Sequence, residues 1–193
     1  MHKIIAIVGM PGAGKSTASD ILLELGWKKI RFGDATMEEI KRRGMEISEE
    51  SESIVRETLR VELGMDAYAK LNEYRLIEAA KNHNVVIDGL YSWQEYIYLK
   101  PKISRLKTIA IYASPKTRYS RLATREVRPL TAEEAKSRDY AELDNLKKAE
   151  PIAMADFTIL NEGTIEDLRN NLKELIAGFE HDSQKNYLGA IFH

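Results

Sequence analysis

The chain has 193 residues, of which 44% are hydrophobic and 31% charged, and its formal net charge is -1. This composition is typical of one globular domain, and the balanced charge gives no bulk basicity for nucleic acid binding. The lack of cysteine excludes disulfides and thiolate metal sites. No run reaches the roughly 20 apolar residues of a membrane span, and the N-terminal run is too short for a signal-peptide core. We expect a cytoplasmic protein without nucleic acid or membrane partners; the sequence sets no oligomeric state.

Short apolar, β-branched runs alternate with helical patterns along the chain. Predicted strands cover 4–8, 29–32 (the weakest), 85–87, 108–112 and 157–160. Continuous apolar runs are typical of a parallel sheet covered on both faces. Predicted helices cover 15–25, 38–43, 51–63, 68–81, 92–99, 115–125, 132–149 and 164–176. The alternation predicts an α/β fold with a doubly wound, five-stranded parallel sheet.

The first predicted strand leads into a glycine-rich turn, GMPGAGKS, at residues 9–16. The turn matches G-x-x-x-x-G-K-[ST] between a strand and a helix, which indicates a phosphate-binding loop. Its glycines allow backbone N–H groups to face an anion, and the helix N-terminus adds partial positive charge. Lys15 can reach the β- and γ-phosphates of ATP, and Ser16 can offer its hydroxyl to Mg²⁺. A glycine turn without a ligand is the alternative. The expected phosphate-binding residues are Gly9, Gly12, Ala13, Gly14, Lys15, Ser16 and Thr17.

Gly33 and Asp34 follow the second predicted strand, at the sheet edge where ligands gather in open α/β folds. A carboxylate there can orient an attacking hydroxyl or accept its proton. The alternative is that Asp34 caps a helix beginning near Thr36. No N-K-x-D guanine signature is present, which argues against a GTPase.

Asp88 follows the buried strand in VVIDG. An acidic residue at this point can hold a Mg²⁺-bound water or approach the Ser of the phosphate loop. A simple Asp-Gly turn is the alternative. We predict Ser16 and Asp88 as the metal-binding residues.

Arginines are frequent between residues 118 and 138. Arg118, Arg121 and Arg125 share one face of a predicted helix, and Arg128 follows near a proline. Arginines carried by a lid can neutralise the charge of a transferring phosphoryl group. A solvated basic face paired with nearby glutamates is the alternative. We expect Arg121, Arg125 and Arg128 to act with Lys15 and Asp34 in catalysis.

Two long segments exceed the length that simple crossovers need. We expect an acceptor-binding insertion at 36–82 and a lid at 124–149. Both would belong to one P-loop kinase domain spanning 1–193. Its core is expected at 1–35, 83–123 and 150–178, and its tail at 179–193.

This layout resembles the nucleoside monophosphate kinase group of P-loop proteins over residues 1–178. FGD and VVIDG are similar to elements of adenylate kinases, and the combination of GMPG-x-GKS, DG and ADxxIxN resembles the adenylate-kinase-related proteins. TREVRPLTAEEAKSRD followed by ADFTILNEGTIEDL resembles the dephospho-CoA kinases.

The resemblance implies a role for each matching residue. Asp34 would lie at the acceptor site, Arg121, Arg125 and Arg128 would be lid arginines, and Asn161 and Gly163 would lie against the donor adenine. We also expect Asp88 and Gly89 to bind the acceptor. Adenylate kinases carry acceptor-binding arginines after both GD and DG, and this chain lacks both. Arg60, in LRVELG, can substitute for them.

We therefore expect an ATP- and Mg²⁺-dependent kinase that transfers the γ-phosphoryl group to a small, nucleotide-like acceptor. A nucleoside monophosphate such as AMP is the leading acceptor, and dephospho-CoA is the alternative. The missing acceptor arginines also allow a third hypothesis, a regulatory module that binds ATP or AMP with little turnover.

Overall fold

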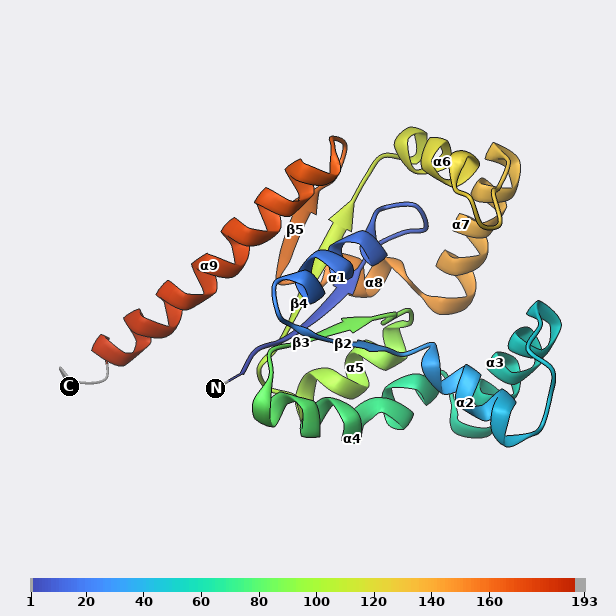
Figure 1. Cartoon of the computed structure of the whole chain (residues 1–193), viewed down its shortest axis with the longest axis horizontal. Helices are drawn as coiled ribbons and strands as arrows, with labels where there is room; N and C mark the ends of the chain where they lie inside the picture. The colour runs from blue at the N-terminus through green and yellow to red at the C-terminus, as the bar shows by residue number, and fades with distance from the viewer. Residues whose placement is uncertain (1, 190–193) are drawn as a thin grey trace.

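The computed structural model describes residues 2–189. In this range five parallel strands form one sheet in the order β2-β3-β1-β4-β5 (Figure 1). The strands are β1 (Ile4–Val8), β2 (Lys28–Arg31), β3 (Val85–Asp88), β4 (Leu106–Tyr112) and β5 (Phe157–Leu160). The predicted parallel α/β sheet is confirmed, and each strand lies within two residues of its predicted position.

Helices connect the strands and cover both faces of the sheet (Figure 1). They are α1 (Lys15–Glu24), α2 (Asp34–Arg42), α3 (Glu49–Leu63), α4 (Ala67–Asn82), α5 (Trp93–Lys102), α6 (Pro115–Thr124), α7 (Ala132–Leu146), α8 (Ala149–Ala153) and α9 (Ile165–Gly189). Capping boxes at Ser48, Ser92 and Thr131 begin α3, α5 and α7. Within residues 2–189, no helix combines the length and the apolar character that crossing a membrane requires.

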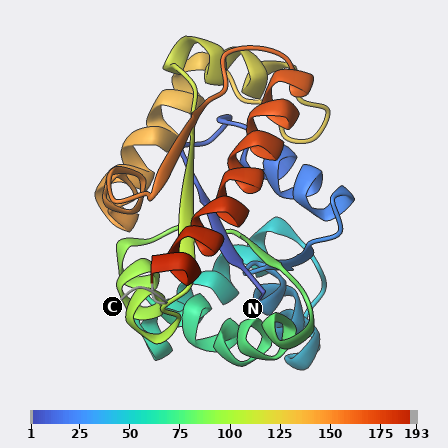
Figure 2. The ribbon, with the colours of Figure 1, turned by 90° about the vertical axis from the view of Figure 1, so that its left-hand side faces the viewer.

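The central strand β1 has two buried faces. Ile5 and Ile7 pack in a cluster with α1 and α9, whereas Ile4 and Ala6 pack in a cluster with α4 and α5. Figure 2 shows α9 lying across the sheet. Because helices cover both faces, the strand needs apolar side chains at every position, which explains its continuous apolar run.

Four predicted helix ends are wrong, and one of them is the end of α5, which lies at Lys102 instead of residue 99. The helix predicted from residue 38 begins at Asp34, because Ala35 and Thr36 are already buried in its first turn. The helix predicted over 132–149 ends at Leu146, because Lys147 adopts a left-handed conformation with a φ of 50°. The last helix continues to residue 189. The end of the predicted tail, 190–193, lies outside the described residues.

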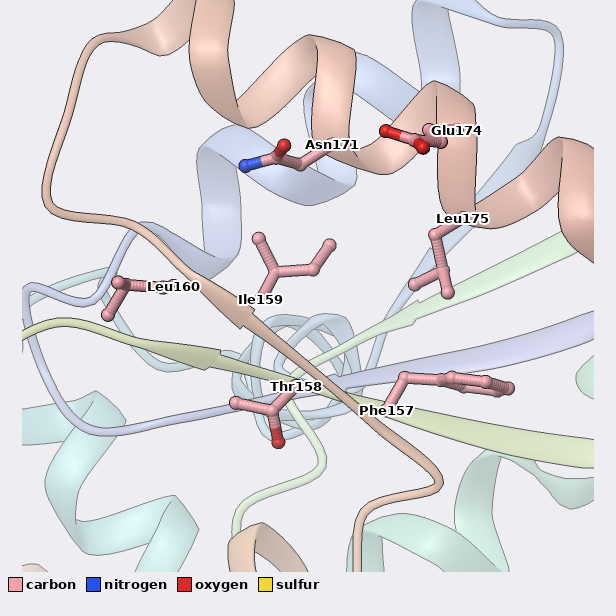
Figure 3. Close-up of a pocket in the computed structure, with 7 residues that line it drawn as sticks. All are labelled: Phe157, Thr158, Ile159, Leu160, Asn171, Glu174 and Leu175. Carbon is pink, nitrogen blue, oxygen red and sulfur yellow. The ribbon is translucent and has the colours of Figure 1, made fainter.

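A groove lies between the edge strand β5 and α9 (Figure 3). It is lined by Phe157, Thr158, Ile159, Leu160, Asn171, Glu174 and Leu175. None of these residues belongs to the glycine-rich turn, so the groove is a feature separate from the candidate site.

Candidate active site

The glycine-rich turn connects β1 directly to α1 at the carboxyl edge of the sheet. Gly9, Gly12 and Gly14 have φ values of 147°, 78° and 101°, which side chains rarely adopt. A Cβ added at Gly12 would lie 2.7 Å from the backbone oxygen of Arg118. The turn therefore requires glycine for two reasons. Its backbone adopts positive φ values, and at Gly12 the Arg118 backbone leaves no room for a side chain.

Side chains from two distant segments hold this turn in place. The Asn161 carboxamide, directly after β5, donates a hydrogen bond to the Ala13 carbonyl oxygen at 2.8 Å. The Arg118 guanidinium in α6 donates to the Pro11 carbonyl oxygen at 3.0 Å. Asn161 thus lies against the phosphate loop. These two side chains therefore help to fix the conformation of the loop.

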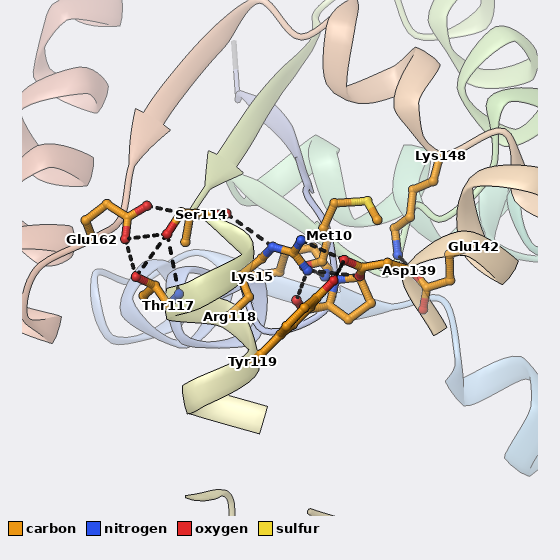
Figure 4. A network of polar contacts seen from close by, with 12 residues as sticks. Met10, Lys15, Ser114, Thr117, Arg118, Tyr119, Asp139, Glu142, Lys148 and Glu162 are labelled. Atoms are coloured by element: carbon orange, nitrogen blue, oxygen red, sulfur yellow. Dashed lines mark hydrogen bonds and ion pairs between the residues drawn. The ribbon is translucent and has the colours of Figure 1, made fainter. Parts of the chain in front are cut away.

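Lys15 lies at the first position of α1, and its ammonium donates to the Met10 carbonyl oxygen at 3.0 Å (Figure 4). Desolvation, followed by the positive charge of Lys148, lowers the pKa of Lys15 to about 7. An anion bound beside Lys15 would stabilise its charged form and raise this pKa. The environment of Lys15 therefore favours binding of an anionic group such as a phosphate.

A second group of charges lies beside Lys15. Lys148 forms an ion pair with Glu142 of α7, and Glu142 also accepts a hydrogen bond from Arg138 at 3.0 Å. The Lys148 side chain is only 3% exposed. Sequence reasoning did not assign a role to Lys148 or Glu142, because a charged segment is usually a solvated helix face.

The residues predicted to hold Mg²⁺ come from adjoining elements. Ser16 is exposed in the first turn of α1. Asp88 is buried at the end of β3, where it lies opposite Ile7 of the neighbouring strand β1. One Asp88 oxygen lies 3.1 Å from the Lys29 ammonium. A hydroxyl and a carboxylate are hard oxygen ligands, and Mg²⁺ usually takes one or two of these together with phosphates and water. The residues present therefore fit a Mg²⁺–nucleotide complex.

Asp34 is the first residue of α2, where it is exposed. The N-cap is Gly33, and no side chain makes a capping hydrogen bond there. The alternative that Asp34 caps the helix is therefore wrong. Asp34 follows the carboxyl end of β2, and Arg31 at that end is in register with Asp88 at the end of β3, as expected for a residue after β2.

Arg60 of α3 is the candidate for the missing acceptor arginines. Its guanidinium carbon lies 5.8 Å from the centre of the Tyr68 ring. The Tyr68 hydroxyl is hydrogen-bonded to Thr36 at 2.6 Å. The Nε atom of Arg60 is buried and has no hydrogen-bond partner among the described residues. A buried donor without a partner is costly, so this atom is available to a ligand.

Glu95, in the first turn of α5, is fully buried near Arg60. One of its oxygens accepts hydrogen bonds from the backbone N–H groups of Tyr91 and Ser92 at 2.6 and 3.1 Å. The other oxygen has no partner in the described part of the chain. Burial raises the pKa of Glu95 to about 7, although the two backbone N–H groups oppose this shift. Nearby, Gly89 has a φ of 104° and lies against the Tyr91 ring.

The predicted lid arginines contact different elements. Arg121 donates to the Gly163 carbonyl oxygen at 3.2 Å, and its other terminal nitrogen is buried without a partner in residues 2–179. Arg125 donates to the backbone oxygen of Arg128. Arg128 lies 3.4 Å from Glu49 in α3, so it connects the segment after α6 to the 36–82 segment. The first arginine is thus placed beside the loop expected to face the donor base.

Arg118 shares the predicted arginine face but is buried. Its guanidinium binds the Asp139 carboxylate through two hydrogen bonds, and Asp139 also accepts one from the Tyr119 hydroxyl at 2.9 Å (Figure 4). Arg118 therefore ties α7 to the phosphate loop, and the alternative of a solvated basic face is wrong for this residue.

A central β1 strand that leads into a G-x-x-x-x-G-K-S turn, in a five-stranded parallel sheet, defines the class of protein: the chain has the fold of the P-loop kinases. A shikimate kinase structure from Bacteroides thetaiotaomicron is similar in fold, with a TM-score of 0.59 and 20% identity over 91% of this chain and 98% of that chain. The expected resemblance to P-loop kinases is confirmed at this level.

The family follows from the sequence comparisons. A model described as AAA domain matches residues 5–141. A UPF0200 protein from Hyperthermus butylicus is 33% identical over 91% of this chain and 95% of its own length. A UPF0200/UPF0201 protein from Archaeoglobus fulgidus is 35% identical over 90% of this chain, which spans 55% of that relative. The chain therefore belongs to the AAA domain family and to the UPF0200 proteins.

Proposed function

We propose that the protein is an ATP- and Mg²⁺-dependent phosphotransferase that moves the γ-phosphoryl group of ATP to a small, nucleotide-like acceptor. A nucleoside monophosphate such as AMP is the acceptor that we favour. The residues around the phosphate loop support the donor half of this proposal. Lys15 and the loop N–H groups bind the donor phosphates, and Ser16 and Asp88 hold Mg²⁺. Asn161, which also holds the phosphate loop, and Gly163 would border the donor base.

The proposed acceptor site is supported by one observation. The Nε atom of Arg60 and one carboxyl oxygen of Glu95 are buried and have no hydrogen-bond partner among the described residues. A guanidinium N–H and a carboxyl oxygen come from α3 and α5, which lie beyond the ends of β2 and β3. A nucleotide supplies an anionic phosphate and hydrogen-bonding groups on its base, so it can satisfy both atoms. Asp34 and Gly89 would border the same space.

The lid arginines complete the proposed site. Arg121, Arg125 and Arg128 would neutralise the charge of the transferring phosphoryl group and exclude water when residues 124–149 close. The partnerless nitrogen of Arg121 supports this role. Residues 36–82 would form the acceptor-binding insertion.

The exposed Asp34 carboxylate favours a second candidate, transfer to the 3′-hydroxyl of dephospho-CoA. A hydroxyl acceptor gains from a general base, whereas a phosphate acceptor is already ionised. Substitution of Asp34→Asn should lower transfer to a hydroxyl by about a hundredfold or more, and transfer to a monophosphate far less. Glu38→Gln, in the same helix, is the matched control.

The proposed function is tested by incubating the protein with ATP, Mg²⁺ and either AMP, other nucleoside monophosphates or dephospho-CoA, and measuring ADP and phosphorylated acceptor. Lys15→Ala should abolish turnover while preserving the fold, and Lys28→Ala, at an exposed position of β2, should leave turnover unchanged. ATP binding without ADP formation from any acceptor would replace the kinase with the binding-module hypothesis. Full activity of Lys15→Ala would overturn the phosphate-loop assignment.

A further inference from the structure

Lys148 is a buried cation in the short link between α7 and α8. Its ammonium pairs with Glu142 (Figure 4). It also lies 5.0 Å from the centre of the Tyr91 ring. A lysine that is 3% exposed is unusual, because burying an ammonium costs free energy unless the charge is compensated. This position therefore requires an explanation.

The local backbone directs Lys148 inward. Lys147 adopts a left-handed conformation, which L residues other than glycine rarely take, and this ends α7. Helix α8 begins directly afterwards at Ala149, with Pro151 in its first turn, where a missing N–H is tolerated. The left-handed residue reverses the chain between the two helices and leaves Lys147 exposed while Lys148 is buried.

The charges around Lys148 do not balance. Three cations, Lys15, Lys148 and Arg138, surround the single carboxylate of Glu142. Two further acids lie nearby: Asp88 is already paired with Lys29, and burial raises the pKa of Glu95 to about 7, so Glu95 carries only part of a negative charge near neutral pH. Arg138 is 48% exposed and is screened by water, whereas the repulsion between Lys148 and Lys15 acts where Lys148 is buried, so these two lysines favour an anion between them. The triphosphate expected at Lys15 would supply that missing negative charge.

Lys148 lies on the acceptor side of Lys15. Lys15 contacts Met10 of the donor loop, whereas Lys148 faces Tyr91 and influences the pKa of Glu95, which belong to the segment after β3. A phosphate chain that runs from the loop toward the acceptor would reach Lys148 with its terminal group.

We propose that Lys148 is a second catalytic lysine, which binds the terminal phosphate of the donor and is held by Glu142 until the donor arrives. This inference rests on the proposed function, because it requires a triphosphate in the loop. Glu142, paired with Lys148, acts as a competing anion. Substitution of Lys148 should therefore weaken donor binding, whereas substitution of Glu142 should strengthen it.

Four variants test this inference through the dissociation constants of Mg²⁺–ATP and ADP, measured by titration calorimetry. Lys148→Met should weaken ATP binding about tenfold or more and ADP binding less than about threefold, because only ATP carries the terminal phosphate. Lys148→Arg should keep most of the affinity. Glu142→Gln should tighten ATP binding by about threefold or more, because it releases Lys148. Lys147→Met, the exposed neighbour, should change neither constant.

The opposite signs separate this role from a structural ion pair. If Glu142→Gln and Lys148→Met weaken ATP binding equally, or if Lys148→Met lowers ATP and ADP affinity alike, the inference is wrong. The double variant Glu142→Gln/Lys148→Met removes both buried charges together; it should unfold near the wild-type temperature and still bind ATP as weakly as Lys148→Met. Wild-type protein that binds no ATP would instead overturn the proposed function itself.

Discussion

The carboxylate of Asp139 in α7 accepts two hydrogen bonds, of 2.9 and 2.7 Å, from the guanidinium of Arg118 in α6, and both side chains are buried. Removal of the carboxylate by Asp139→Ala would leave a buried, uncompensated guanidinium. We expect the free energy of unfolding to fall by about 3–5 kcal/mol, measured by urea denaturation.

Asp144→Ala, at an exposed position of the same helix, is the control and should cost far less. The paired variant Asp139→Leu/Arg118→Met, which removes both charges, should recover part of the loss. Equal stability of Asp139→Ala and the control would show that the buried pair contributes nothing.

Gly14 tests the link between the phosphate loop and the last strand. A Cβ at Gly14 would overlap the Asn161 carboxamide, which holds Ala13. Gly26, just after the same helix, also has a positive φ, but no atom of the described residues lies within 4 Å of its added Cβ. Gly26→Ala should therefore lower stability by about 1 kcal/mol through backbone strain alone.

Gly14→Ala should lower stability more and should also abolish ATP binding, because the loop must move away from Asn161. Thermal unfolding and nucleotide titration of both variants provide the comparison. Wild-type ATP affinity in Gly14→Ala would mean that the loop tolerates a side chain there.

Glu95 gives stability a dependence on pH. Its pKa is raised from 4.5 to about 7 in the folded protein, so the folded state holds this proton more tightly than the unfolded chain. The contribution of Glu95 to the free energy of unfolding is therefore present below about pH 4.5 and is lost as the pH rises to about 7. We expect Glu95→Gln to gain stability relative to wild type across this window, by at most about 3 kcal/mol.

The measurement is urea denaturation of both proteins between pH 4.5 and 8. Glu57→Gln, an exposed position in α3, controls for the general effect of losing a carboxylate. A difference between Glu95→Gln and wild type that stays constant with pH would contradict the raised pKa.

Asp88 connects the proposed metal site to Lys29. Asp88→Asn should raise the Mg²⁺ concentration needed for half-maximal ADP formation by about tenfold, because an amide is a weaker ligand than a carboxylate. Asp20→Asn removes the other acidic partner of Lys29, 2.9 Å away, and should leave the Mg²⁺ dependence unchanged. If both variants respond alike, the effect comes from Lys29 and not from the metal.

The sequence was sufficient to predict the sheet because burial on both faces produces continuous apolar runs, as in Ile4–Val8. The phosphate loop was equally visible, since its glycines are needed locally. The edge strand β2 gave the weakest signal, because only Ile30 in it is buried.

The interior charges could not be predicted from the sequence. Arg118 and Asp139 are 21 residues apart, and no periodicity connects them. Lys148 lies in a segment so rich in charge that a solvated surface is the ordinary expectation. Which charged side chains turn inward depends on the packing of α6, α7 and α8 and on the left-handed Lys147, which the sequence pattern did not reveal.

The position of β1 in the middle of the sheet has a consequence for how this protein family can change. The proposed acceptor elements follow β2 and β3 on one flank, and the proposed lid follows β4 on the other. The phosphate loop belongs to neither flank. Within residues 36–82, α4 covers β1 and must keep its apolar face, whereas the exposed positions of α2 and α3 are free to vary around the proposed acceptor without changing the donor loop. Substrate preference would then diverge among relatives that keep the same donor.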